Sequence, residues 1–312
     1  MHVVLGSRSL SRGEKAVAEV IASQPSAEGR LDLLELDVTS DKSVAAAAEA
    51  VAAKYPEPLF GLCNNAGVGF GKSIPNTLET NFYGTKRVCE AFLPLLDPAE
   101  GRICNVASAS GPNFVRGLDE AGTTLFTSRS TTWDQLKAEL DKYSMGTDFE
   151  GKDCAGSQMR LIPPPLETGV RVPAPTGVAY GLSKAAVNVW TMQLAAANPN
   201  LKINSCSPGY ILTDLTRGMG ATKRPEESNC VRRLVLILAS GWSSPNLLLC
   251  LSYCFLHSPD RDPPPQHVAP LFLLFGNVPT PATNPGRYYG SDAVRSPIDR
   301  YRGPGDPPYE GD

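Results

Sequence analysis

Residues 59–67 read Leu-Phe-Gly-Leu-Cys-Asn-Asn-Ala-Gly, a short apolar run that ends in two polar and two small residues. Short apolar runs bounded in this way are typical of buried β-strands. The sequence contains four further runs of this kind, at residues 3–5, 31–36, 102–106 and 202–206. Helical stretches alternate with these runs, near residues 11–23, 41–54, 78–96 and 180–197. Such alternation predicts an α/β fold with a parallel sheet.

Lys184 lies four positions after Tyr180 in the segment Tyr-Gly-Leu-Ser-Lys. Side chains with this spacing share one face of a helix, so we expect the ammonium group close to the phenol. A phenol titrates near pH ~10, and a neighbouring cation is expected to lower that pKa towards a value suited to general acid catalysis. By itself the pair is a weak signal, because ten tyrosines in 312 residues also produce this spacing by chance.

Three further motifs precede this pair: Asn-Asn-Ala-Gly at 64–67, Asn81 in a helical stretch, and Asn-Val-Ala-Ser at 105–108. Taken in this order, these three motifs and the Tyr180–Lys184 pair resemble the short-chain dehydrogenase/reductase family. The resemblance covers residues 1–227 and 268–292, and it implies a Rossmann-like, doubly wound parallel sheet.

Within that family, the chain is most similar to the monomeric, NADPH-dependent carbonyl reductases. The 72 positions from Ser108 to Tyr180 match the long insertion of that subgroup. Residues 4–13 are similar to its second strand and the following turn, and residues 207–214 are similar to the exit of the family's sixth strand. The implied activity is reduction of an aldehyde or ketone to an alcohol.

The resemblance assigns four catalytic residues. It makes Tyr180 the general acid and Lys184 its electrostatic partner, which also contacts the nicotinamide ribose. Ser108 would donate to the carbonyl oxygen, and Asn81 would hold a water of the proton relay. Simpler interpretations also stand: Ser108 is an ordinary hydroxyl at a strand end, and Asn81 satisfies backbone groups of a helix.

The implied cofactor is NADP(H). An acidic residue after the second strand would bind a free ribose 2′-hydroxyl, whereas an arginine there accommodates a 2′-phosphate. Arg8 occupies this position, and Arg12 is either a second contact or a solvated charge. The resemblance adds Tyr180, Lys184 and five further residues to the cofactor site: Asp37, Asn64, Ala66, Gly67 and Thr213.

One part of the family pattern has no counterpart in the sequence. The family's first strand ends in a glycine-rich turn whose backbone N–H groups hold the pyrophosphate, and no Thr-Gly-x-x-x-Gly-x-Gly segment occurs in this chain. We therefore expect a sheet that lacks its first, central strand and the helix after it, which an incomplete gene model would explain. The alternative function is accordingly a truncated, catalytically inactive family member or a binding remnant.

A single cofactor-binding domain is expected over residues 1–292, followed by a tail rich in proline and glycine at 293–312. Residues 112–178 form the insertion near the substrate pocket, where Thr-Thr-Trp-Asp at 131–134 resembles a helix capping box. We expect this insertion to block the helix pairing by which many relatives assemble, so the protein is predicted to be a monomer.

Residues 228–267 form an anomalous apolar insert that ends in Pro-Pro-Pro-Gln. We interpret the insert as a retained intron, which a transcript joining residue 227 to the region of residue 268 would confirm. The alternative is a membrane anchor, since residues 234–256 carry no charge and follow two arginines. Glycine, proline and polar residues interrupt the middle of that stretch and disfavour an anchor.

Composition excludes several classes of protein. The net charge is −3, without charge runs, so nucleic-acid binding is not expected. The eight cysteines form no C-x-x-C motif, and only three histidines are present, so we expect no metal site. The cysteine usage suits a reducing compartment, and the predicted location is cytoplasmic.

Overall fold

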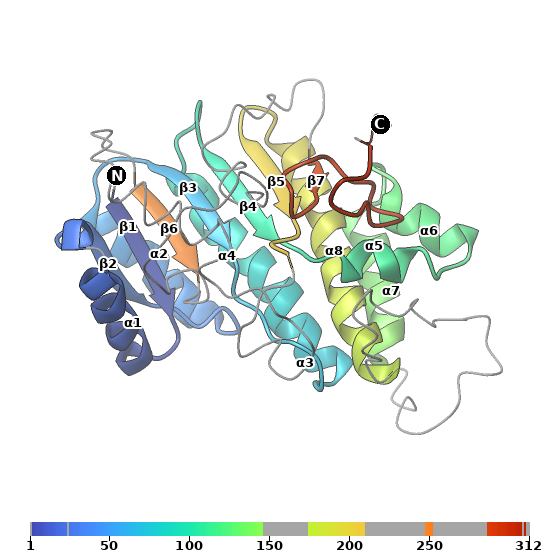
Figure 1. The fold of residues 1–312 in the computed structure, drawn as a ribbon, viewed down its shortest axis with the longest axis horizontal. Coiled ribbons are helices and arrows are strands. Elements are labelled where there is room, and N and C mark those ends of the chain that lie inside the picture. The colour runs from blue at the N-terminus through green and yellow to red at the C-terminus, as the bar shows by residue number, and fades with distance from the viewer. Residues whose placement is uncertain are drawn as a thin grey trace.

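The computed structural model describes residues 2–23, 25–145, 174–209, 247–251, 286–307 and 309. Seven parallel strands form one sheet in the order β2-β1-β6-β3-β4-β5-β7 (Figure 1). The strands are β1 (His2–Ser7), β2 (Leu31–Glu35), β3 (Leu59–Asn64), β4 (Arg102–Val106), β5 (Lys202–Cys206), β6 (Leu247–Leu251) and β7 (Tyr288–Tyr289). The helices are α1 (Leu10–Ser23), α2 (Asp41–Lys54), α3 (Ile74–Leu78), α4 (Gly84–Phe92), α5 (Ser110–Val115), α6 (Glu120–Thr127), α7 (Trp133–Met145) and α8 (Ala174–Ala197). The predicted α/β fold with a Rossmann-like, doubly wound parallel sheet is confirmed.

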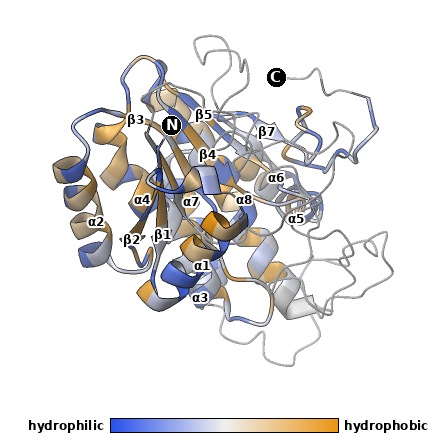
Figure 2. Ribbon diagram, turned by 60° about the vertical axis from the view of Figure 1, so that its left-hand side comes forward, coloured by the Kyte–Doolittle hydropathy of each residue, from blue (hydrophilic) through white to orange (hydrophobic). Residues whose placement is uncertain are grey.

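One row of apolar side chains crosses the sheet, because register partners in parallel strands point to the same face. Each residue of the row is the partner of the next: Val4, Leu249, Leu62, Ile103 and Ile203. All five belong to the main hydrophobic cluster, together with residues of α2, α4 and α8. Figure 2 shows the strands as mostly hydrophobic, whereas α1 and α2 carry both hydrophobic and hydrophilic residues.

Helix α1 covers the opposite face of the sheet. Leu33 of β2 is the register partner of Leu5, which alternates with Val4 and therefore points away from the row of apolar residues. A Cβ atom at Gly13 of α1 would fall 2.3 Å from Leu33 Cδ1, so glycine permits the close approach of α1 to this face. Helices thus lie against both faces, as a doubly wound fold requires.

The centre of the sheet corrects one expectation. The sheet does not lack a central strand, because β6 lies between β1 and β3 and pairs in parallel with both. Leu248 and Leu249 of β6 are fully buried. The strand comes from the segment interpreted as an anomalous insert, of which the structure describes only residues 247–251. The five residues of β6, which come late in the sequence, therefore occupy the central position between β1 and β3.

The alternative of a membrane anchor at 234–256, which the sequence already disfavours, does not agree with this strand, because residues 247–251 lie inside the sheet. Among the residues that the structure describes, every helix is too short or too polar to span a bilayer.

The insertion packs on α4 and α8 through α7. A capping box forms one residue later than predicted, between Thr132 and Gln135: Thr132 N donates to Gln135 Oε1 at 2.8 Å, and Gln135 N donates to Thr132 Oγ1 at 3.3 Å. The ring of Trp133 lies 6.2 Å, between centroids, from both Phe82 and Trp190. The insertion therefore covers helices of the main domain, while residues 146–173 lie outside the described part of the chain.

Residues 293–307, expected to be a tail, pack against the edge of the sheet. Ser296 N donates to Tyr288 O at 3.0 Å, next to strand β7. The Arg302 guanidinium is buried and forms an ion pair with Asp292, with Nη1 at 2.8 Å from Oδ2. A buried, paired charge fixes this segment to the domain, since separating the pair would leave a charge without its partner.

Leu249→Ala should lower the free energy of unfolding by about 2–5 kcal/mol, because it leaves a cavity between β1 and β3. Leu10→Ala is the matched control. Its side chain is 45% exposed, and we expect a loss of less than about 0.5 kcal/mol. Urea unfolding of both variants measures the difference, and equal losses would contradict the central position of β6.

Candidate active site

The candidate site lies at the carboxyl edge of the parallel sheet. Strands β3, β4 and β5 are in register there, with Asn64 opposite Asn105 and Asn105 opposite Ser205. Ser108 follows β4, and helix α8 presents Tyr180 and Lys184 beside it. Ligands of open α/β sheets bind at this edge, outside the carboxyl ends of the strands.

Tyr180 is buried on α8, with 8% of its surface exposed. Burial raises the pKa of Tyr180 to about 12, and the nearby Ser108 side chain acts in the opposite direction. The phenol is therefore protonated at neutral pH and has a proton to donate.

Lys184 occupies the same face of α8. Its Nζ donates to Val106 O at 2.8 Å and lies 5.6 Å from the centre of the Tyr180 ring. Burial lowers the pKa of Lys184 to about 8, while the charge interaction with Cys206 raises it. At pH 7 most of the ammonium groups are therefore charged.

The expected direction of the Tyr180 pKa was wrong. Spacing predicts that Lys184 lowers this pKa, whereas in the folded protein the pKa is raised. Both side chains are removed from water, and desolvation disfavours the phenolate as strongly as it disfavours the ammonium group. The spacing places the two groups together correctly but carries no information about their burial.

Asn81 lies in a π-helical turn, Glu79–Tyr83, that interrupts the helical stretch between α3 and α4. Turns of this kind occur frequently at functional sites. The side-chain oxygen of Asn81 accepts from Val68 N at 2.7 Å, and Nδ2 donates to Val68 O at 3.0 Å and to Ser183 Oγ at 3.1 Å. The Asn81 amide thus joins the loop after β3 to α8, and its role in holding a water stays a prediction.

This loop carries an aromatic residue that the sequence analysis missed. The ring centroid of Phe70 lies 4.7 Å from that of Tyr180. Phe70 follows Val68 by two residues, so the Asn81 contacts hold the segment that covers Tyr180. The Asn-Asn-Ala-Gly motif ends at Gly67, so Phe70 lies outside it. An aromatic residue three positions after the motif is the sequence feature that could have identified it.

Two glycines bring α5 against α8. A Cβ atom at Gly181 would fall 2.9 Å from Phe114 Cβ, and one at Gly111 would fall 3.0 Å from Ala185 N. Each distance is shorter than side chains normally allow, so larger residues would push α5 away from α8. Because α5 begins two residues after Ser108, this contact helps to keep Ser108 beside Tyr180.

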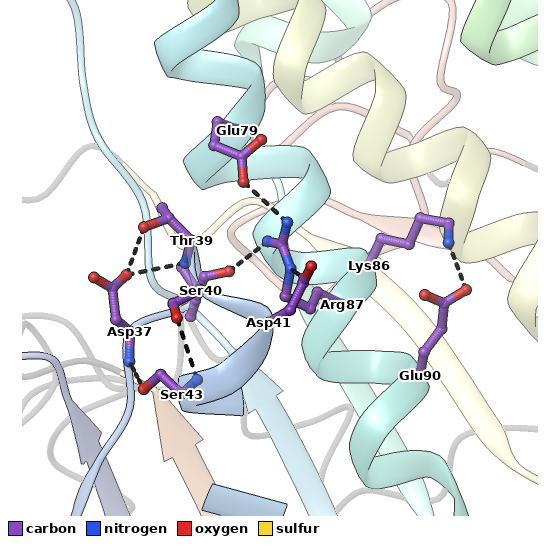
Figure 3. A network of polar contacts seen from close by, with 10 residues as sticks. Asp37, Thr39, Ser40, Asp41, Ser43, Glu79, Lys86, Arg87 and Glu90 are labelled. Carbon is purple, nitrogen blue, oxygen red and sulfur yellow. Dashed lines mark hydrogen bonds and ion pairs between the residues drawn. The ribbon is translucent and has the colours of Figure 1, made fainter. Parts of the chain in front are cut away.

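Arg8 and Asp37, which the sequence predicts for the cofactor site, follow strands β1 and β2, and Figure 3 shows Asp37 beside Thr39. Asp37 Oδ1 accepts from Thr39 N at 2.9 Å and from Thr39 Oγ1 at 2.7 Å. These hydrogen bonds lower the pKa of Asp37, as do the charges of Arg8 and Arg87. Asp37 is therefore ionised at neutral pH, and Arg8 is near enough to interact with it.

The Asn-Asn-Ala-Gly motif contributes differently along its length. Asn64 Nδ2 donates to Asn105 Oδ1 at 2.9 Å and to Cys89 Sγ at 3.1 Å, so its side chain points into the protein. Its Oδ1 is buried without a hydrogen-bond partner among the described residues. Gly67 approaches the catalytic pair, since a Cβ atom there would fall 3.8 Å from Lys184 Nζ.

A dinucleotide fits one part of this edge better than another. The small residues Ala66 and Gly67 leave the backbone accessible beside Lys184, which suits a close ligand. At the end of β6, where the family has its glycine-rich turn, the described residues stop at Leu251. Thr213 also lies outside the described residues, so its predicted contact stays a prediction.

Comparison with known proteins agrees with this architecture. The model of the short chain dehydrogenase family matches residues 1–119. Carbonyl reductase (NADPH) 1 of Sus scrofa is 30% identical over 242 residues, which are 72% of this chain and 74% of that protein. The (+)-neomenthol dehydrogenase of Arabidopsis thaliana is 27% identical over 271 residues, or 76% and 83% of the two chains.

Among solved structures, salutaridine reductase from Papaver somniferum has the same fold, with a TM-score of 0.58 and 23% identity. The similarity covers 79% of this chain and 90% of that one. The sheet order and the position of the site define an α/β protein of the Rossmann-like class. With a relative 30% identical over almost three quarters of both chains, the chain belongs to the short-chain dehydrogenase/reductase family.

Phe70→Ala should lower the pKa of Tyr180 from about 12 towards its ordinary value, because water would reach the phenol. Ultraviolet titration of tyrosinate measures this, with Tyr180→Phe in the same background to subtract the other tyrosines. Phe70→Leu is the matched control, since it keeps an apolar cover and should leave most of the shift. An unchanged Tyr180 titration in Phe70→Ala would show that Phe70 does not shield the phenol.

Proposed function

We propose that the protein is an NADPH-dependent oxidoreductase that reduces the carbonyl group of a small aldehyde or ketone to an alcohol, with Tyr180 as general acid. The observation that carries this proposal is the buried, protonated Tyr180 phenol near Ser108, with Lys184 Nζ 5.6 Å from the centre of its ring, at the carboxyl edge of the sheet. The relatives support it, since those named above are a carbonyl reductase, described as using NADPH, and a dehydrogenase.

Each side chain has a defined task in this reaction. The nicotinamide cofactor supplies hydride to the carbonyl carbon when it is bound. Ser108 donates a hydrogen bond to the carbonyl oxygen, and Tyr180 gives its proton to that oxygen as negative charge develops there. The Lys184 ammonium then stabilises the phenolate that remains, which offsets part of the cost of ionising a buried phenol. Hydride on carbon and a proton on oxygen complete the alcohol.

Apart from Thr213, which lies outside the described residues, the residues proposed to hold NADP(H) lie along the carboxyl edge. Arg8 would pair with the 2′-phosphate, because a guanidinium matches phosphate geometry. Asp37 would contact the adenine, and Asn64, Ala66 and Gly67 would line the adenosine side. Tyr180 and Lys184 would contact the nicotinamide ribose, and Thr213 the nicotinamide amide.

A second candidate is a family member without catalysis. It is favoured by the sequence, which contains no Thr-Gly-x-x-x-Gly-x-Gly segment. Without backbone N–H groups directed at the pyrophosphate, cofactor affinity would be low. Cofactor binding separates the two candidates.

We also propose that the protein is a monomer in the cytoplasm. The packing of Trp133 against Phe82 and Trp190 supports the first part, because α7 covers surfaces of α4 and α8 that helix pairing would need. Lys86 reinforces this contact, with its Nζ 4.6 Å from the centre of the Trp133 ring. The proposed cytoplasmic location is based on composition alone.

Tyr180→Phe should lower kcat by about 10²–10⁴-fold, because it removes the proton donor, while leaving the Kd for NADPH within about threefold. Tyr55→Phe is the matched control: its hydroxyl is hydrogen-bonded to Asp32 at the other end of the sheet, so kcat should not change. Steady-state reduction of a ketone panel gives both values. Full activity of Tyr180→Phe would refute the assigned acid.

Arg8→Ala should raise the Kd for NADPH by about 10–100-fold, as expected for one charge-assisted contact, and leave the Kd for NADH nearly unchanged. The control is Arg30→Ala, since Arg30 is exposed and bonded to Ser26 O. Quenching of protein fluorescence by each cofactor measures the affinities. A parallel loss of both would mean that Arg8 has a structural role instead.

A further inference from the structure

Among the described strands, only β6 pairs with both parts of the sheet. In the order of the seven strands, β2 and β1 lie on one side of it, and β3, β4, β5 and β7 lie on the other. The partners of β6 run from His2 to Gly6 on β1 and from Leu59 to Asn64 on β3. Removal of β6 would leave two half-sheets with no ladder between them.

The path of the chain makes β6 topologically separable. In sequence β6 comes between β5 and β7, and these two strands are neighbours at one edge of the sheet, with Cys206 opposite Tyr289. The ladder between β5 and β7 therefore does not depend on the position of β6. Residues 210–246 and 252–285, which join β6 to these strands in sequence, lie outside the described residues.

Contacts outside the sheet also hold the two halves together. Arg87 of α4 donates to Val38 O at 2.6 Å and pairs with Asp41 of α2 and, at 3.0 Å, with Glu79 (Figure 3). A Cβ atom at Gly84 would fall 2.8 Å from Val38 Cγ2, so α4 packs closely on the segment after β2. These contacts do not involve β6, so they do not require that strand for their own geometry.

The proposed cofactor residues divide between the same two halves. Arg8 and Asp37 follow β1 and β2, whereas Gly67, Ser108 and the residues of α8 follow β3 and β4 or pack on them. The register of β6 aligns Gly6 with Leu251 and Leu251 with Asn64. The strand thus helps to set the spacing between the adenosine side and the catalytic side, together with the contacts of Arg87 and Gly84.

We propose that β6 is a separately docked segment that positions the two halves of the cofactor site, so that strand docking and NADPH binding stabilise each other. This inference rests on the proposed function for its ligand. A ligand that contacts both halves binds the docked form preferentially. By linkage, NADPH at 100 times its Kd lowers the undocked population by about 100-fold.

Hydrogen exchange of the wild-type chain tests the coupling. Saturating NADPH should slow exchange of the backbone amides of residues 247–251 by more than tenfold. The amides of β5, which pairs with β4 and β7 inside one half-sheet, are the internal control and should change less. Exchange of β6 that is unaffected by bound NADPH, or slowed no more than that of β5, would overturn the coupling.

Complementation in trans tests the docking without any cofactor. Leu249→Asp places a carboxylate between β1 and β3 and should lower the Tm of the chain. A synthetic peptide of residues 245–253 should restore that Tm in a saturable way, whereas the same peptide carrying Leu249→Asp should not. Leu249→Ser serves as the second variant if the aspartate prevents folding. No restoration in a folded variant would refute the separate docking.

The two tests distinguish the inference from the proposed function. Restoration of the Tm by the peptide, in a chain that binds no NADPH, would refute the reductase proposal. It would keep β6 as a docked segment but overturn its coupling to NADPH binding. NADPH binding without restoration by the peptide would keep the reductase proposal and overturn the inference.

Discussion

The parallel pairing of β6 with β1 and β3 is the constraint on which the rest of the structure depends. Leu249 stands between Val4 and Leu62 in the apolar row that crosses the sheet, and α2, α4 and α8 pack on that row. The same pairing aligns the carboxyl ends of β1 and β3, from which Arg8 and the Asn-Asn-Ala-Gly motif continue. Hydrophobic burial at the centre of the sheet and the geometry of the site are therefore consequences of one strand.

Desolvation governs the chemistry at the carboxyl edge. Tyr180 and Lys184 are both buried, and each pKa moves in the direction that disfavours charge. A phenol with a raised pKa keeps its proton, while an ammonium group with a pKa of about 8 remains mostly charged at pH 7. The pair therefore combines a proton donor with a cation that stabilises the phenolate after transfer. Asn81, through its two hydrogen bonds to Val68, fixes the loop whose Phe70 ring lies against Tyr180.

Local pattern was sufficient to predict much of the fold and the catalytic residues. Five strands were predicted from short apolar runs between helices, one of them beginning at residue 59, and the structure has a strand at each of these runs. The structure brings Ser108, Tyr180 and Lys184 together, as their motifs predict. Strand β6 was not predicted, because a run such as 247–251 carries no information about which strands it joins across two hundred residues. The direction of the Tyr180 pKa and the role of Phe70 depend on burial in the folded chain, which spacing does not encode.

With β6 at the centre of its sheet, this chain is proposed to form a working NADPH site. Fluorescence titration of NADPH with the purified 312-residue protein tests that claim most directly, with NADH as the reference ligand. The account predicts saturable binding of one NADPH per chain, tighter than binding of NADH. No saturable binding to a folded monomer would contradict it, and would favour a family member without catalysis.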